Sequence, residues 1–110
     1  MQFSCEIVKN ALFVQIGGEI DLDNADALRK KLDEALDATC MRKLICDLEG
    51  VRFIDSTGLG GLLGRYRKLA AQGGGVKLVN VSEPIYRILA LSGLTEIMQV
   101  EKKSKALGAF

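Results

Sequence analysis

Apolar and polar residues alternate in two runs at the start of the chain. Residues 2–8 and residues 11–17 each follow this pattern, with the apolar phase at Phe3, Cys5, Ile7, Leu12, Val14 and Ile16. Two such runs joined by the short polar turn Lys9-Asn10 predict a β-hairpin. We expect Gly17 and Gly18 to end the second strand.

Three later segments have the apolar spacing of amphipathic helices. The first spans residues 24–38, and Asp21, Asp23 or Asn24 can cap it. The second spans residues 56–72 and ends at the glycine run 73–75. The third follows a capping Ser82, carries Pro84, the only proline, in its first turn, and ends at Gly93.

Short apolar runs predict further strands at residues 43–48, 76–81 and 96–100, with residues 50–55 as a loop. The order β-β-α-β-α-β-α-β indicates an α/β fold with a mixed, mostly parallel sheet of four to five strands. Residues 43–48 alternate, with Asp47 opposite the apolar set. We therefore expect helices mainly on one face and a more exposed opposite face.

The length of 110 residues fits a single domain, which we place at residues 1–100, with a frayed or weakly helical tail at 101–110. The apolar fraction of 48% is enough for a core. Fifteen Lys and Arg against 14 Asp and Glu give a net charge of +1, which argues against a nucleic-acid partner. The chain has no histidine, which excludes Ser-His-Asp and Cys-His catalysis, histidine phosphotransfer and most catalytic zinc sites.

The three cysteines are an odd set without C-x-x-C spacing, so we expect reduced thiols in a cytosol. Cys5 and Cys46 are in phase with apolar neighbours, as small core residues are. The chain has no apolar run of roughly 18 residues, as a membrane helix requires. Its first residues lack the basic and apolar regions of a signal peptide, and we expect a cytoplasmic protein without a membrane partner.

Residues 55–64 put four glycines into the opening turns of the second helix. Each interior glycine costs about 1 kcal/mol relative to alanine, which calls for a compensating role. A helical wheel places Leu59, Leu62, Leu63 and Tyr66 on the side that meets the sheet. The opposite side is a nearly bare strip that would let another backbone approach, formed by Gly60, Gly64 and Ala71, flanked by Thr57 and Gly61, with Ser56, Arg67 and Lys68 nearby.

Three interpretations of this segment remain open. In the first, Asp55, Ser56 and Thr57 only cap the helix, and the glycines serve close packing. In the second, the helix N-terminus binds a phosphate ligand. However, no G-x-x-x-x-G-K-[ST] is present, and Leu63 stands where the dinucleotide fingerprint needs its last glycine. In the third, the strip is a protein-docking face with a hydroxyl switch, Ser56, at its edge.

The segment Asp55-Ser56-Thr57-Gly58-Leu59-Gly60, followed by Leu63-Gly64-Arg65-Tyr66, resembles the signature of bacterial anti-sigma factor antagonists of the STAS family. Gly18-Glu19-Ile20-Asp21 and Leu91-Ser92-Gly93-Leu94 resemble two further family markers, so the resemblance covers almost the whole chain. The segment Leu63-Gly64-Arg65-Tyr66-Arg67 is most similar to the sporulation member. The family fold is a small sheet with helices layered against it.

This resemblance implies a non-enzymatic switch that uses no cofactor of its own. The unphosphorylated form would bind an anti-sigma factor that is also a serine kinase and so release the sigma factor. That kinase would phosphorylate Ser56 with ATP and end the binding, and a PP2C-type phosphatase would reverse the modification. The implied partner-binding residues are Gly18, Glu19, Asp21, Asp23, Asn24, Asp55, Thr57, Gly58, Gly60, Gly61, Gly64, Arg67 and Lys68.

Other functions are less favoured by the residues. Glu19, Asp21 and Asp23 form an acidic loop that is usually solvated or capping, and neither a metal site nor a paired-carboxylate hydrolase is indicated. We expect Arg65, Arg67 and Lys68 to form a solvated face and Tyr66 to lie in the core. The alternative with the same fold is a scaffold subunit of a lipid-transport or stress-sensing complex, in which Ser56 is only a cap. A small-ligand or nucleotide-binding module is a third hypothesis.

Overall fold

The structure is a computed structural model that describes residues 1–103. Its elements, in chain order, are β1 (Gln2–Val8), β2 (Ala11–Ile20), α1 (Ala25–Thr39), β3 (Lys43–Ile54), α2 (Ser56–Ala71), β4 (Gly75–Val81), α3 (Glu83–Leu91), α4 (Leu94–Ile97) and β5 (Gln99–Lys102). The five strands form one sheet in the spatial order β1-β2-β3-β4-β5. β1 is antiparallel to β2, and the remaining pairs are parallel. The predicted fold class is therefore confirmed.

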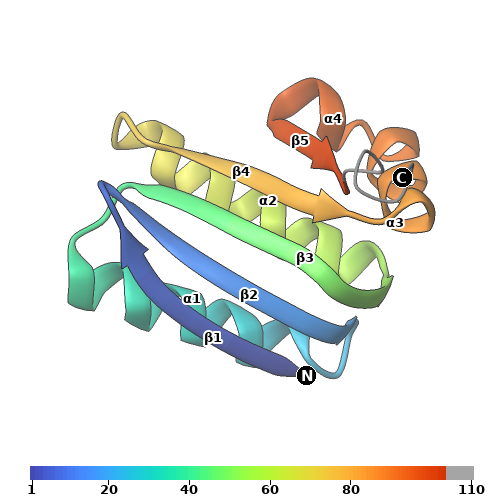
Figure 1. Cartoon of the computed structure of the whole chain (residues 1–110), viewed down its shortest axis with the longest axis horizontal. Coiled ribbons are helices and arrows are strands. Elements are labelled where there is room, and N and C mark those ends of the chain that lie inside the picture. The colour runs from blue at the N-terminus through green and yellow to red at the C-terminus, as the bar shows by residue number, and fades with distance from the viewer. Residues whose placement is uncertain (104–110) are drawn as a thin grey trace, which may run out of the picture.

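Two long helices cover one face of the sheet. α1 and α2 lie behind β1–β4 in the view of Figure 1, while α3 and α4 lie beside the ends of β4 and β5. Buried leucine, isoleucine and valine side chains from both helices and from the strands form a single core. Tyr66 packs against this core, as expected. No helix within residues 1–103 is long and apolar enough to cross a membrane.

The hairpin of β1 and β2 forms as the alternation predicts. Val8 pairs with Ala11, so the loop between the strands is Lys9-Asn10. Lys9 has a φ of 57°, the left-handed backbone that tight hairpin turns require.

β2 and β3 are both longer than predicted. β2 continues through Gly17 and Gly18 to Ile20, and residues 50–54, expected in a loop, belong to β3. The two strands pair across shifts of register, with Gly17 beside Gly50. A Cβ at Gly50 would lie 3.1 Å from the Gly17 Cα, and Gly18 has a φ of +92°. Gly17, Gly18 and Gly50 therefore do not end their strands. They let β2 and β3 approach each other closely where the pairing shifts register.

The end of the domain also differs from the prediction. Residues 94–97 form the short helix α4, and the last strand begins at Gln99 rather than at residue 96. Gly93, with a φ of +86°, turns the chain from α3 into α4 and lets Leu94 reach the core. Residues 101 and 102, assigned to the tail, belong to β5, and the rest of the expected tail from residue 104 lies outside the described residues.

Two expectations about buried residues are wrong. Cys5, expected in the core, is exposed because β1 is the edge strand, whereas Cys46 is buried as predicted. Asp47, expected on a more exposed face, is only 6% exposed. Its carboxylate accepts hydrogen bonds from Asn80 Nδ2 (3.0 Å) and from the backbone N–H of Glu49 (2.9 Å). These bonds replace the water that burial removes.

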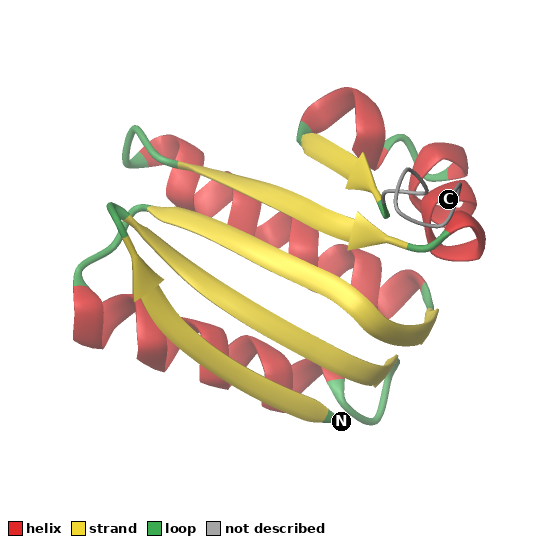
Figure 2. Ribbon diagram, in the orientation of Figure 1, coloured by secondary structure: helices red, strands yellow, loops and turns green. Residues whose placement is uncertain are grey.

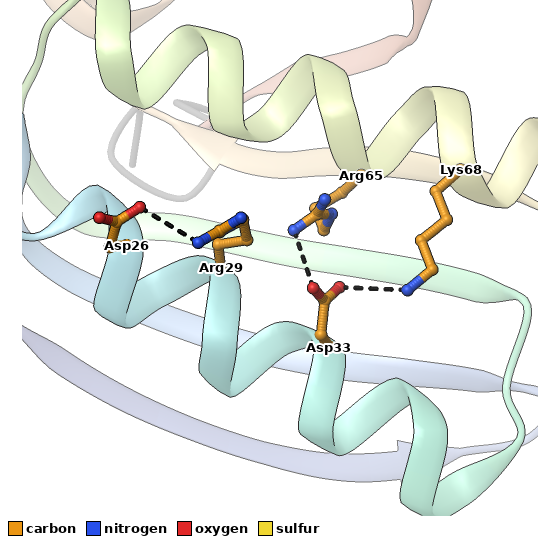
Figure 3. A network of polar contacts seen from close by, with 5 residues as sticks. All are labelled: Asp26, Arg29, Asp33, Arg65 and Lys68. Atoms are coloured by element: carbon orange, nitrogen blue, oxygen red, sulfur yellow. Dashed lines mark hydrogen bonds and ion pairs between the residues drawn. The ribbon is translucent and has the colours of Figure 1, made fainter.

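A network of ion pairs joins α1 to α2. Asp33 lies 3.2 Å from Arg65 Nη1 and 3.5 Å from Lys68 Nζ, and Figure 3 shows both contacts bridging the two helices. Arg65 was expected on a solvated face, but its side chain is only 14% exposed. Its charge is directed at the neighbouring helix rather than at solvent.

Candidate functional site

The site predicted from the sequence lies where two loops meet at one end of the sheet. The loop between β2 and α1 and the turn between β3 and α2 both follow the carboxyl ends of these strands (Figure 2). β2 and β3 are parallel neighbours, which brings Ile20 beside Ile54. Residues 18–24 and 55–60, far apart in the sequence, are thereby brought together.

Asp55 fixes these two segments to each other. It is the N-cap of α2, where its Oδ1 accepts a hydrogen bond from the Gly58 N–H (3.0 Å). Its Oδ2 accepts a second bond from the Leu22 N–H (3.0 Å), and its own N–H donates to the Ile20 carbonyl (3.2 Å). One side chain therefore caps the helix and holds the neighbouring loop.

These hydrogen bonds stabilise the charged form of the Asp55 carboxyl. The bond from the Gly58 N–H is the main cause that lowers the pKa of Asp55, and the bond from Leu22 acts in the same direction. Partial desolvation opposes them without reversing the direction. A carboxylate is therefore held next to Ser56 across the neutral pH range.

The loop between β2 and α1 is ordered by its own side chains. Asp21 Oδ1 accepts hydrogen bonds from the backbone N–H groups of Asp23 and Asn24, both 3.1 Å long. Asn24 occupies the N-cap position but makes no side-chain cap bond, and its Nδ2 donates instead to the Glu19 carbonyl (3.0 Å). Among the three capping candidates, Asp21 therefore supplies the side-chain acceptor at the start of α1.

The acidic side chains of this loop differ in their exposure to solvent. Glu19 and Asp23 are exposed, while Asp21 is half-buried and used by the backbone. Within residues 1–103, no group of three or more acidic or cysteine side chains is placed to hold a metal ion.

Glycines at the start of α2 have two different environments. Gly58 is buried, and a Cβ there would lie 2.2 Å from the Ile20 carbonyl oxygen, so this position accepts only glycine. A Cβ at Gly60, Gly61 or Gly64 would meet nothing within 4 Å. The bare strip predicted on the outer side of α2 is therefore present at Gly60 and Gly64. Gly58 is not part of it, because it packs against β2.

Of the residues that flank the strip, some are exposed on the outer side of α2 and others are directed toward α1. Ser56 and Thr57 are exposed on the first turn of α2, and within residues 1–103 neither hydroxyl makes a hydrogen bond to the protein. Arg67 is exposed on the outer side. Gly61 faces α1, where it borders Ala25 and Leu28, and Lys68 is directed toward Asp33. The open surface thus consists of Ser56, Thr57, Gly60, Gly64 and Arg67.

Two exposed apolar side chains lie near this end of the sheet, and the sequence analysis did not single them out. Leu22, 73% exposed, lies in the loop that Asp55 holds, and Phe53, 47% exposed, precedes Ile54 at the end of β3. Residues 50–55 were expected to form a loop, and a loop has no regular alternation from which the exposed or buried position of an apolar side chain could be predicted. Their true conformation as a strand would have placed Phe53 opposite the buried Ile54.

A shallow cavity of about 480 Å³ lies away from this surface. It is lined by residues that include Lys43, Tyr66, Val76 and Met98, at the other end of the sheet. No residue of the predicted site takes part in it.

Comparison with known proteins gives a consistent result. The family model of the STAS domain matches residues 2–107. An anti-sigma F factor antagonist from Paenibacillus polymyxa is 34% identical over 100 residues, covering 91% of this chain and 86% of that protein. An anti-sigma-B factor antagonist from Bacillus subtilis is 38% identical over 97 residues, covering 88% and 87%.

Solved structures of one relative share the fold. The anti-sigma factor antagonist SpoIIAA in its unphosphorylated form superposes with a TM-score of 0.77 at 28% identity, covering 98% of this chain and 95% of that one. The phosphorylated form of SpoIIAA, from Bacillus, superposes with a TM-score of 0.70 at 28% identity, covering 98% of both chains.

Proposed function

Because the chain belongs to the STAS domain family, we propose that it is an anti-sigma factor antagonist controlled by phosphorylation of Ser56. Its unphosphorylated form binds an anti-sigma factor that is also a serine kinase, and the bound sigma factor is released. The kinase then ends this binding by modifying Ser56. A PP2C-type phosphatase returns the protein to the binding form.

The chemical step belongs to the partner. The Ser56 hydroxyl oxygen attacks the γ-phosphorus of ATP held by the kinase, ADP leaves, and the serine proton passes to a base of the kinase. The antagonist is thus a substrate and a ligand, without catalysis or a cofactor of its own. It acts in the cytoplasm, where the kinase finds ATP.

The observation that carries this proposal is the place of Ser56 beside the open strip of α2. Its hydroxyl is exposed, and Asp55 rather than Ser56 caps the helix, so the serine is not required for helix initiation. A phosphate there adds roughly −1.5 to −2 charges at the positive end of a helix dipole, which tolerates them. The fold can therefore stay unchanged while the surface charge next to Asp55 changes strongly.

The unmodified surface has the features of a docking site. Gly60 and Gly64 allow a partner backbone to approach α2 closely, and Leu22, in the loop that Asp55 holds, offers an exposed apolar anchor near Ser56. Glu19 and Asp23 supply exposed carboxylates that suit a basic patch on the kinase. Apolar contact near Ser56 also explains why phosphorylation ends kinase binding, because a phosphate buried at such an interface would lose its water at a high free-energy cost.

Incubation with the cognate anti-sigma kinase and ATP tests the proposal. Mass spectrometry should find a single phosphate on Ser56, and the modified protein should no longer bind the kinase. Phosphate on another residue only, or no phosphate, would contradict the proposal. Ser56→Ala is the matched control, which should bind the kinase and accept no phosphate.

Ser56→Asp separates this function from the alternative scaffold function. In a switch, the added carboxylate should weaken kinase binding by at least about tenfold, which corresponds to about 1.4 kcal/mol. In a permanent scaffold, the variant should bind its partners as the parent protein does.

A further inference from the structure

The two edges of the sheet differ in how they are protected from other strands. β5 forms one edge, with only four residues, and its charged side chains are engaged in ion pairs: Glu101 with Lys77 (2.7 Å) and Lys102 with Glu83 (3.4 Å). Short edge strands and charged side chains discourage pairing with another chain.

β1 forms the other edge and lacks these protections. It has seven residues with no proline and no lysine, and it pairs with β2 without any shift of register. Glu6 is its only charged residue, and Ile7 and Val8 are 52% and 42% exposed. Within residues 1–103 its outer side meets no other strand. A regular, mostly uncharged edge of this length is a template for strand addition.

The hairpin decides which backbone groups face outward. Val8 and Ala11 flank a two-residue turn and are therefore a hydrogen-bonded pair. Hydrogen-bonded and non-hydrogen-bonded pairs alternate along an antiparallel ladder, so alternate residues of β1 bond to β2. The N–H and C=O groups of Phe3, Cys5 and Ile7 consequently point to the free edge.

We infer that the free edge of β1 binds the β1 strand of a second copy of this chain, antiparallel and centred on Cys5. About this centre, residues 2–8 of both copies overlap fully, and the outward groups of Phe3, Cys5 and Ile7 face those of Ile7, Cys5 and Phe3 in the second copy. Two five-stranded sheets thereby join into one across a two-fold axis.

The side chains of β1 suit this pairing with itself. Phe3 of each copy lies opposite Ile7 of the other, an aromatic and β-branched pair of the kind that stabilises antiparallel sheets. Phe3 and Ile7 project to the face that α1 covers, where Lys31 Nζ lies 5.6 Å from the Phe3 ring. On the opposite face, Glu6 lies opposite Ser4 of the other copy, so the only charge of the strand does not meet its equivalent. Pairing of β1 with a second copy of itself therefore opposes no like charges along the strand.

Cysteine cross-linking tests the register. In a Cys5→Ser, Cys40→Ser background, Ser4→Cys and Glu6→Cys place exposed thiols on residues that lie directly opposite between copies. A mixture of the two variants should form a disulfide-linked heterodimer on mild oxidation, because opposed strand residues have the Cα separation of a disulfide. Each variant alone sets its thiols at diagonal positions about 7–8 Å apart and should cross-link much less. Equal cross-linking in all three samples would overturn the register.

Light scattering after size exclusion tests the association itself, over a range of protein concentrations. The full chain should show a monomer–dimer equilibrium, and Ile7→Lys should weaken it by at least about tenfold, since it charges the edge. Leu91→Lys is the matched control, because Leu91 is 85% exposed on α3, far from β1 in the chain, and its change should leave the dimer intact. A monomer at every concentration, or a dimer that Ile7→Lys does not weaken, would overturn the proposal. Circular dichroism of both variants checks that each one is folded.

Discussion

At the residue scale, two glycines of α2 that stand two positions apart have opposite structural roles. Gly58 lets the helix approach the Ile20 carbonyl, while Gly60 faces open space. The first glycine is therefore required by packing, and the second carries only the entropic cost of glycine in a helix. This difference explains why Gly58 is needed for packing, whereas Gly60 leaves the surface of α2 bare.

Substitution by alanine should separate these two roles. Gly58→Ala should destabilise the protein by about 1–3 kcal/mol, because backbone on both sides must shift to accept the methyl group. Gly60→Ala should stabilise it by about 0.5–1 kcal/mol. Urea unfolding of both variants measures the difference. A stable Gly58→Ala protein would show that β2 and α2 are less closely packed than described.

Asp55 gives a second prediction at this scale, concerning pH. Its folded pKa is lowered, so its contribution to stability is fully present above the ordinary aspartate pKa of about 3.9 and is lost as the pH falls through the folded value. Asp55→Asn should therefore be less stable than the parent at neutral pH. The two proteins should converge in unfolding free energy at acid pH. Urea titrations between neutral pH and pH 2 test this, and a constant difference would contradict the assigned role.

At the element scale, α1 and α2 are held to each other by charge as well as by the core. Asp33 binds Arg65 and Lys68 across the helix interface, whereas Asp26 and Arg29 pair within α1 at the surface (Figure 3). The pair within α1 is exposed, with the Arg29 side chain 56% and the Asp26 side chain 94% accessible, so it stabilises little. Removing Asp33 instead leaves a largely buried guanidinium without its partner.

Asp33→Ala should therefore lower the free energy of unfolding by about 1–3 kcal/mol. Asp26→Ala is the matched control on the same helix and should cost at most about 1 kcal/mol. A double variant with Arg65→Met should cost less than the sum of the single changes, because the unpaired charge is removed. Strict additivity would show that the two side chains do not interact.

The outer side of α2 gives the prediction that separates binding from stability. Gly64→Arg should leave the fold intact, because a Cβ there meets nothing within 4 Å and the position lies on the outer side of α2. It should weaken kinase binding, because it fills the strip. Ala90→Arg on α3 is the matched control, since it adds the same side chain at an exposed position. If Gly64→Arg instead unfolds the protein, and kinase binding falls only by the fraction that is unfolded, the assigned docking surface is contradicted.

At the scale of the whole molecule, the sheet and its two covering helices decide which thiols are reactive. Cys46 lies at the centre of the sheet and is fully buried, and this burial raises the pKa of its thiol to about 12. Cys5 and Cys40 are exposed. At protein concentrations low enough for the monomer, a thiol reagent at neutral pH should therefore label Cys5 and Cys40 in the folded protein, and Cys46 only after unfolding. Rapid labelling of Cys46 in native conditions would indicate a core that opens readily.

The sequence by itself determined most of the secondary structure, because alternation and helical spacing are local patterns. It also determined the bare strip at Gly60 and Gly64, since the leucines of α2 define the opposite side of the helix. The family followed from motifs that the sequence carries directly.

Only the tertiary structure decided the features that depend on neighbours from distant segments. β2 and β3 extend past their glycines because Gly17 and Gly50 face each other, which neither segment reveals alone. Gly58 is buried only because Ile20 lies against it. A local sequence pattern indicates which residues can be buried. The arrangement of strands in the sheet decides which segment buries them, and it also decides that β1 is an edge strand with one free side.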